Sequence, residues 1–156
     1  MLVCEIPGRG ELRLEHLVLD YNGTIACDGA LLPDVVERLL LLSQNLRIHL
    51  VTADTFGSVA KKTEGLPLGL TILTGSDHTK QKGALVERLG AERCAAIGNG
   101  ANDAAMLEAA AVGIAVAQTE GCALSALRSA DILCTSVTDA LDLLLFPNRL
   151  RATLRL

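Results

Sequence analysis

The sequence predicts a three-layer α/β fold of the Rossmann-like kind, in which helices cover both faces of a mostly parallel central sheet. Two observations predict it. Short apolar runs alternate with helical patterns along the chain, as repeated strand-helix-strand units require. The run Leu17–Asp20 is apolar up to its final carboxylate, which is typical of a strand buried on both faces. The 156 residues suit a single domain.

The elements follow in order. Residues 1–15 form an expected extra hairpin, in which Leu2–Ile6 and Glu11–Leu14 flank a turn rich in Gly and Pro. The expected sheet strands are Leu17–Asp20, Leu46–Thr52, Leu70–Leu73, Cys94–Ile97, Val112–Ala117 and Ile132–Cys134. The expected helices are Pro33–Gln44, Gly57–Glu64, Thr79–Leu89, Asn102–Ala110, Ala123–Ser129 and Thr138–Leu145. Pro33 suits the first turn of its helix, and Gly65 and Gly90 suit helix ends.

The last segment, residues 146–156, is expected to be a tail. From Asn148 onward it is basic, with leucines between its arginines. Such a tail can be a frayed end or a docking arm, and we favour the frayed end.

Composition excludes several classes of protein. Half of the residues are apolar, aromatic residues make up 2%, and the net charge is −4, which argues against a nucleic-acid partner. No apolar run approaches the length of about 18 residues that spans a bilayer, and the N-terminus does not resemble a signal peptide. We therefore expect no membrane partner and a cytoplasmic location. The five cysteines form no Cys-x-x-Cys pair, so core thiols are expected rather than a zinc site.

Polar side chains follow the ends of several expected strands, where ligands bind in parallel sheets. These residues are Asp20, Thr52, Asn99, Asn102 and Asp103, joined at the start of an expected helix by Lys80 and Lys82. Alone, Asp20 could simply open a turn. Together, carboxylates, a hydroxyl and a lysine suit a phosphoryl group bound with Mg²⁺. An aspartate in such a group can attack phosphorus.

The same residues resemble a known family. The stretches Asp20–Thr24 and Gly98–Asp103, with Thr52 and Lys82 between them, look like the four motifs of the haloacid dehalogenase superfamily. The resemblance covers nearly the whole chain. It is strongest to the phosphorylation domain of P-type ATPases and to soluble, capless phosphatases related to it, and residues 82–103 also resemble phosphoserine phosphatases. We expect no membrane helices and no room for a nucleotide-binding domain in these 156 residues, and therefore do not expect a pump.

The resemblance implies a role for each residue. Asp20 would be the nucleophile and a Mg²⁺ ligand, joined in the metal site by Asn22 through its carbonyl, by Asn99 and by Asp103. The phosphate would be held by Thr52, Lys82 and Asn102. Lys80 competes for the lysine role, but Val86 and Leu89 follow Lys82 at helical spacing, as in the family. We therefore favour Lys82 and place Lys80 on a solvated helix face.

Two positions depart from the family. Asn22 stands where many of its phosphatases carry an acid/base Asp, and Asn99 stands where a metal-binding Asp is usual. An amide cannot transfer the proton, and general acid-base help is commonly worth about 10²- to 10⁴-fold, so slow turnover is expected. The neutral Asn99 should weaken Mg²⁺ binding but also crowd the phosphate less. Both residues precede Gly, so both can also be plain turn residues.

Motif spacing leaves no room for a cap domain. Thr52 follows Asp20 by 32 positions and Lys82 follows Thr52 by 30, while residues 24–32 fit only a short flap. Water must then be excluded by another source. A second copy of the chain, with residues 1–14 as a possible interface, or a macromolecular substrate could supply it. We expect a homo-oligomer acting on a phosphorylated small molecule or macromolecule.

The function predicted from the sequence is a Mg²⁺-dependent phosphohydrolase that works through an aspartyl-phosphate at Asp20. The alternative is a weak or inactive regulatory module, which the amides Asn22 and Asn99 would suit. A phosphoacceptor receiver domain fits less well, because it does not carry a stretch such as Gly98–Asp103.

Overall fold

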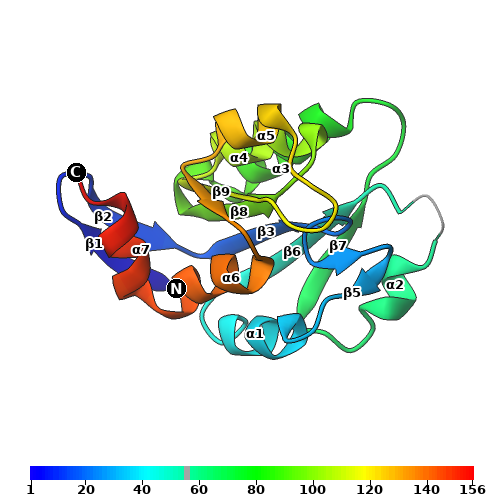
Figure 1. The fold of residues 1–156 in the computed structure, drawn as a ribbon, viewed down its shortest axis with the longest axis horizontal. Coiled ribbons are helices and arrows are strands. Elements are labelled where there is room, and N and C mark those ends of the chain that lie inside the picture. Colours follow the sequence, from blue (N-terminus) through cyan, green and yellow to red (C-terminus); the bar gives the residue numbers. More distant parts are fainter. Residues whose placement is uncertain (55–56) are drawn as a thin grey trace.

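The computed structural model describes residues 1–54 and 57–156 (Figure 1). Its centre is a six-stranded sheet in which neighbouring strands all run parallel. The strands are β3 His16–Asp20, β6 Arg47–Thr52, β7 Leu68–Ile72, β8 Cys94–Gly98, β9 Val112–Val116 and β10 Ile132–Cys134. This confirms the predicted α/β fold and makes the sheet parallel throughout.

The strand order positions the site. Along the sheet the order is β10-β9-β8-β3-β6-β7. The chain therefore enters the central sheet at β3. It adds β6 and β7 on one side of β3 and then adds β8, β9 and β10 on the other side. In open α/β sheets, ligands bind beyond the carboxyl ends of the strands at such a reversal. Asp20 is the last residue of β3 and lies at this point.

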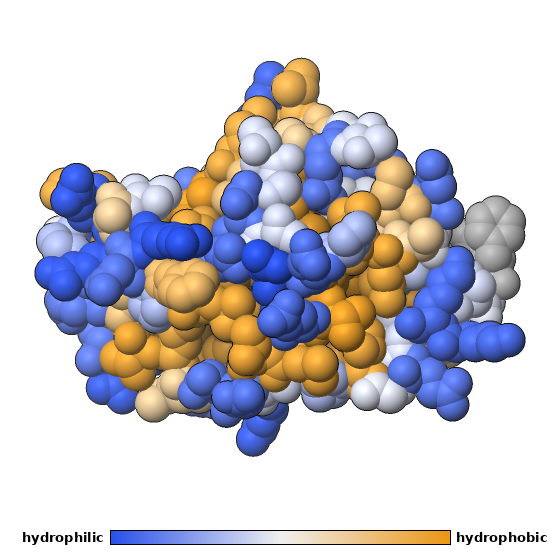
Figure 2. All heavy atoms as spheres, turned by 60° about the horizontal axis from the view of Figure 1, so that its bottom comes forward, coloured by the Kyte–Doolittle hydropathy of each residue, from blue (hydrophilic) through white to orange (hydrophobic). Residues whose placement is uncertain are grey.

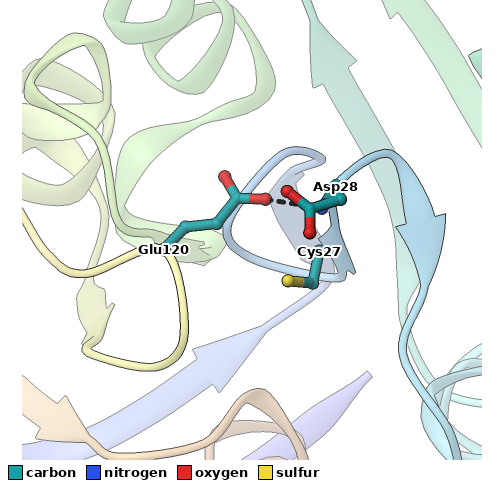
Figure 3. A group of neighbouring side chains, drawn as sticks. All are labelled: Cys27, Asp28 and Glu120. Carbon is teal, nitrogen blue, oxygen red and sulfur yellow. Dashed lines mark hydrogen bonds between the residues drawn. The ribbon is translucent and has the colours of Figure 1, made fainter.

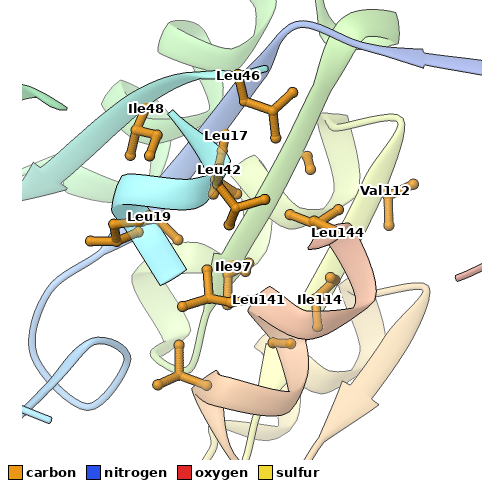
Figure 4. Close-up of a cluster of buried hydrophobic side chains, with 14 of the residues drawn as sticks. Leu17, Leu19, Leu42, Leu46, Ile48, Ile97, Val112, Ile114, Leu141 and Leu144 are labelled. Atoms are coloured by element: carbon orange, nitrogen blue, oxygen red, sulfur yellow. The ribbon is translucent and has the colours of Figure 1, made fainter. Parts of the chain in front are cut away.

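Helices cover both faces of the sheet (Figure 1). One face carries α1 Val35–Leu42 and α6 Val137–Leu145, and the other carries α3 His78–Leu89, α4 Ala104–Ala109 and α5 Leu124–Ser129. Alternation along β3 divides the core, because Leu17 and Leu19 join one buried cluster and Val18 joins the other. Figure 4 shows the first cluster, in which sheet residues such as Leu19 face Leu42 and Leu141. The short helix α2 Val59–Lys62 precedes β7.

Two predicted helix starts need correction besides that of α2, which spans Val59–Lys62 and not the expected Gly57–Glu64. Pro33 was expected in the first turn of its helix, but α1 begins at Val35 because Asp34 adopts a left-handed conformation with φ 63°. The helix expected from Asn102 begins at Ala104. A 3₁₀ turn, Ala101–Asp103, precedes it because the Asp103 carboxylate accepts hydrogen bonds from backbone N–H groups just upstream. The first residue of each helix depends on local side-chain and backbone geometry, which the spacing of apolar residues does not predict.

The N-terminal hairpin is present, and the expected frayed tail is wrong. Strands β1 Leu2–Ile6 and β2 Gly10–Leu14 pair antiparallel. The tail instead forms helix α7 Pro147–Leu154, which contacts β1 and buries Leu150 and Leu154. These leucines are four residues apart and so share one helix face, while Pro147 occupies the tolerated first position. Because arginines separate the leucines, the sequence of this segment is polar on average and does not predict that two of its leucines pack against a strand.

A two-stranded flap follows the Asp20 turn. Strands β4 Ala26–Cys27 and β5 Ala30–Leu31 pair antiparallel. Asp28 and Gly29 connect them with φ 49° and 75°, the positive angles that a tight two-residue hairpin requires. This is the short flap expected for residues 24–32. The described elements between β3 and β8 include no separate cap domain.

The outer surface of the α1 and α6 layer is partly apolar. Figure 2 brings this side forward and shows hydrophobic side chains gathered on it. The exposed apolar residues here include Val36, Leu40 and Leu41 of α1, Phe146 just before α7 and Val3 of β1. None of the helices formed by residues 1–54 and 57–156 is long and apolar enough to cross a bilayer.

We predict that Gly113→Ala destabilises the protein. A Cβ at Gly113 in β9 would lie 2.3 Å from the Leu107 carbonyl oxygen of α4, so backbone would have to move. Overpacking of this kind typically costs about 1–3 kcal/mol, measurable by denaturant unfolding. Gly69→Ala is the matched control, because its Cβ would meet nothing closer than 3.9 Å. Equal unfolding free energies for the two variants would contradict the packing argument.

A histidine pair should make stability depend on pH. His16 Nδ1 and His49 Nε2 lie 3.0 Å apart on β3 and β6. Burial lowers the pKa of both rings below 6.5, and Arg47 adds to this for each. The unfolded chain therefore binds more protons, so this stability is complete above about pH 6.5 and is lost as pH falls through the depressed pKa values.

The test compares unfolding free energies of the wild type and His49→Gln between pH 7.5 and 5.5. Glutamine does not titrate, so the difference between the two proteins should shrink as pH falls. Subtracting the two curves removes the contribution of other titrating groups. A difference that stays constant over this range would refute the assignment.

Candidate active site

A buried lysine joins three elements at the carboxyl end of the sheet. Lys82 Nζ lies 2.6 Å from Asp20 Oδ1 and 2.6 Å from Asp103 Oδ1. The Lys82 and Asp103 residues are 0% exposed, and Asp20 is 7% exposed. The lysine comes from α3, Asp20 from the end of β3, and Asp103 from the turn after β8. The three residues converge as the strand-end pattern predicted.

The position of Lys82 follows from the periodicity of α3. Its buried residues are Lys82, Gly83, Leu85 and Val86, so the lysine lies on the face that covers the sheet. Lys80 is exposed, and its backbone N–H donates to the capping Asp77 carboxylate. The structure thus brings Lys82, and not Lys80, to Asp20.

Asp103 also shapes the loop after β8. Its Oδ2 accepts hydrogen bonds from the backbone N–H groups of Asn99 at 2.9 Å and Gly100 at 2.8 Å. Its other oxygen is bound to Lys82. Both carboxylate oxygens are therefore engaged in holding the lysine and the loop.

Asn99 and Thr24 close the other side of Asp20. The Thr24 hydroxyl lies 3.2 Å from Asp20 Oδ2 and 3.1 Å from Asn99 Oδ1. Asn99 Nδ2 donates to the Gly121 carbonyl at 3.0 Å, which fixes the amide with its oxygen toward Thr24. Gly23 permits this approach, because a Cβ there would lie 2.3 Å from Asn99 Nδ2.

The remaining predicted residues surround this centre at different depths. Thr52, the last residue of β6, is buried, and its hydroxyl accepts the Asp54 N–H at 3.3 Å. Asn102 is half-buried in the 3₁₀ turn beside Asp103. Asn22 is exposed and lines a cavity next to Tyr21. The fold therefore brings the four predicted stretches to one edge of the sheet.

Two side chains near the site were not anticipated. Thr24 lay within the recognised motif, but no role was assigned to its hydroxyl. Gln118 Nε2 donates to the carbonyls of Gly23 at 3.1 Å and Thr24 at 2.6 Å, while its Oε1 accepts the Val137 N–H at 2.8 Å. Gln118 is 94 positions from Thr24, so no local pattern could indicate this contact.

The buried charges do not balance. Two carboxylates, Asp20 and Asp103, share the single ammonium of Lys82. Burial raises the pKa of Asp20 to about 7, and the neighbouring Asp103 adds to this, against the opposing effect of Lys82. Burial alone would lower the pKa of Lys82, but the two carboxylates outweigh it and raise that pKa. A further positive charge near Asp20, Lys82 and Asp103 would therefore be stabilised by the excess negative charge.

The oxygen atoms around Asp20 fit a hard divalent cation. Asp20 Oδ2 and Asn99 Oδ1 both face the Thr24 hydroxyl, which has only one proton to donate. One acceptor is thus always left for another partner. A carboxylate and an amide oxygen are ligands of the kind that Mg²⁺ takes, usually with several waters.

A model of the family described as haloacid dehalogenase-like hydrolase matches residues 78–138, which include Lys82 and Asp103. Two uncharacterized proteins of Methanocaldococcus jannaschii also match. One is 50% identical over 60 residues, covering 38% of this chain and 64% of that protein, just under two thirds of its length. The other is 46% identical over 39 residues, covering 25% of this chain and 89% of that protein.

Solved structures share the fold. The 3-deoxy-D-manno-octulosonate 8-phosphate phosphatase from Moraxella catarrhalis, in complex with magnesium, phosphate and KDO, has a TM-score of 0.68 at 20% identity, covering 85% of this chain and 86% of that one. A zinc-transporting PIB-type ATPase has a TM-score of 0.63 at 26% identity, covering 79% of this chain and 20% of that one. The family match over residues 78–138 and the shared fold show that this chain is similar to the haloacid dehalogenase-like hydrolases.

Proposed function

We propose that the protein is a Mg²⁺-dependent phosphohydrolase that forms an aspartyl-phosphate on Asp20. The observation that carries the proposal is the buried contact of Lys82 with both Asp20 and Asp103 at the reversal point of the sheet. An ammonium beside a strand-end carboxylate can neutralise a phosphoryl group and orient it for attack. The magnesium-bound phosphatase of the same fold supports this chemistry.

The reaction takes two displacements. A carboxylate oxygen of Asp20 forms a bond to phosphorus, and the bond from phosphorus to the leaving-group oxygen breaks. That oxygen takes its proton from solvent. A water oxygen then attacks the phosphorus, the bond to Asp20 breaks, and the water proton passes to solvent. Inorganic phosphate is released and the Asp20 carboxylate is restored.

The phosphate is held by neutral and cationic donors. Lys82 stays protonated, because its two carboxylates raise its pKa, and it supplies positive charge to the phosphoryl oxygens. The Thr52 hydroxyl, buried at the end of β6, and the half-buried Asn102 amide supply hydrogen bonds. These groups are fixed by the sheet and its turns, so little reorganisation is needed when charge develops.

Mg²⁺ would be held by oxygens of three residues: the Asp20 carboxylate, the Asn22 backbone carbonyl and the Asn99 side-chain oxygen. When bound, it supplies positive charge to the phosphoryl oxygens. Asp103 supports this site by holding the loop that carries Asn99. A bound cation would also favour the ionised form of Asp20, whose pKa burial raises to about 7.

Asn22 makes the enzyme slow in this proposal. The residue is exposed beside the cavity, where a leaving group would depart, but its amide cannot give or take a proton. The alternative function is a catalytically weak or inactive regulatory module. The amides Asn22 and Asn99 favour it, whereas the complete set of Asp20, Lys82 and Asp103 contacts favours the enzyme.

The substrate is a phosphorylated small molecule or macromolecule, with a second copy of the chain or the substrate itself excluding water. The apolar surface over α1 and α6 supports a homo-oligomer (Figure 2). A cytoplasmic location is supported by the five cysteines, all of which are free thiols.

Replacing Asp20 by Asn should lower hydrolysis of an aryl phosphate with Mg²⁺ by at least about 10³-fold, because the nucleophile is lost. Release of the aryl alcohol measures this directly. Asp34→Asn is the matched control, since Asp34 is exposed and Asn tolerates its left-handed backbone. Equal activity of the wild type and Asp20→Asn would show that the nucleophile is assigned wrongly.

Replacing Asn22 by Asp should raise kcat by about 10²-fold or more, because a carboxyl can protonate the leaving oxygen and later accept a proton from water. Steady-state kinetics on the same aryl phosphate measures it. Asn148→Asp, an exposed position in α7, makes the same change far from the site. No gain from Asn22→Asp, with no binding of phosphate or Mg²⁺ by calorimetry, would favour the regulatory module instead.

A further inference from the structure

A cavity of about 470 Å³ lies next to the two residues that follow the proposed nucleophile. It begins at Tyr21 and Asn22, the two residues that follow Asp20, and extends between the flap turn, the start of α2 and Glu120. Its volume suits a small-molecule ligand. An ester whose phosphate is bound at Asp20 would place its leaving group in this cavity, since Asn22, two residues further along the chain, lines it.

The charges that line this cavity are predominantly negative. The described lining residues include three acids, Asp28, Asp54 and Glu120, and one base, Lys62. Asp54 is engaged, because its carboxylate accepts the N–H groups of Ser58 at 3.0 Å and Val59 at 3.3 Å. The Lys62 ammonium donates to the Gly29 carbonyl at 2.6 Å. Both oxygens of Asp54 are thus used, whereas the Asp28 carboxylate and the second oxygen of Glu120 are left to meet a ligand.

Asp28 and Glu120 are held together at the mouth of the cavity. Glu120 Oε1 accepts the backbone N–H of Asp28 at 2.8 Å, and Figure 3 shows both carboxylates and Cys27 gathered there. One ligand atom from each of the three residues lies within 4.8 Å of the others. Glu120 lies in the loop after β9, so the contact joins this loop to the flap. Two carboxylates from separate segments therefore lie close together, and that of Glu120 is held by the backbone of the flap.

We infer that the preferred substrate is a phosphate monoester whose alcohol part carries a protonated amine, an inference that rests on the proposed phosphatase activity. The phosphate lies at Lys82 and the ammonium lies at Asp28 and Glu120. A molecule with a negative and a positive end is aligned by the two charged regions. A carboxylated leaving group, such as the octulosonate of the structurally similar phosphatases, would meet like charge here.

Electrostatics sets the size of the preference. Charges about 4 to 6 Å apart near a protein surface interact strongly enough to change binding by about tenfold at low salt. Exposed charges are screened, so the preference should decrease as ionic strength rises. The kcat/KM of substrates with neutral leaving groups should lie between the values for cationic and anionic leaving groups.

The experiment uses three phosphates with the same two-carbon backbone: ethanolamine phosphate, ethylene glycol phosphate and phosphoglycolate. They end in an ammonium, a hydroxyl and a carboxylate. With Mg²⁺ at low salt, kcat/KM for the ammonium compound should exceed that for the carboxylate compound by at least about tenfold. In Asp28→Asn/Glu120→Gln the ratio should approach one. Asn tolerates the positive φ of position 28, and Gln can still accept the Asp28 N–H.

The control Glu5→Gln/Glu11→Gln also removes two negative charges, but from the N-terminal hairpin. It should keep the wild-type ratio of kcat/KM for the ammonium and carboxylate compounds. If an aryl phosphate is hydrolysed but the three compounds react equally, this inference is wrong and the phosphatase stands. The same holds if the ratio survives in Asp28→Asn/Glu120→Gln. If the acids instead bind Mg²⁺, calorimetry will show a site lost in that variant with no ranking of substrates, which overturns the inference. If no phosphate ester is hydrolysed, both proposals fail.

Discussion

The buried ion pairs of Lys82 are the interaction on which the rest of the site depends. An ammonium with no exposed surface is stable only where opposite charges compensate its loss of water, and Asp20 and Asp103 provide them at 2.6 Å. Removal of one partner from such a group is strongly destabilising, since it leaves a charge uncompensated. The contacts therefore constrain three segments at once: the end of β3, the inner face of α3 and the turn after β8.

The same contacts explain why the polar loops around Asp20 are ordered. Asp103 holds Lys82 with one oxygen and two loop N–H groups with the other. The loop places Asn99, whose amide oxygen faces Thr24 and whose nitrogen reaches Gly121. Lys82, Asp103, Asn99 and Thr24 thus each have a partner on a different segment near Asp20. Preorganised donors of this sort are worth more in a buried site than in water, because they need no rearrangement during reaction.

Much of this arrangement could be predicted from the sequence because it depends on local patterns. Apolar runs located the strands, and helical spacing after Lys82 distinguished it from Lys80. The helix α7 was not predicted, because arginines separate Leu150 from Leu154 and the strand β1 that buries them lies more than 140 positions earlier. The contacts of Gln118 with the turn after Asp20, and of Glu120 with Asp28, could not be predicted either, since the partners lie about 90 positions apart. Interactions between distant segments carry no local signal.

Gln118 connects the turn after Asp20 to helix α6 on the other side of the fold. The first N–H groups of a helix have no partner within it, and the N–H of Val137 at the start of α6 is satisfied by this side chain. The nitrogen of the same amide donates hydrogen bonds to the carbonyls of Gly23 and Thr24. Rigidity in α6, whose outer neighbours form the apolar surface, is therefore transmitted to the turn beside Asp20 by one planar group. A protein without this amide would keep its sheet and lose this link between α6 and the turn beside Asp20.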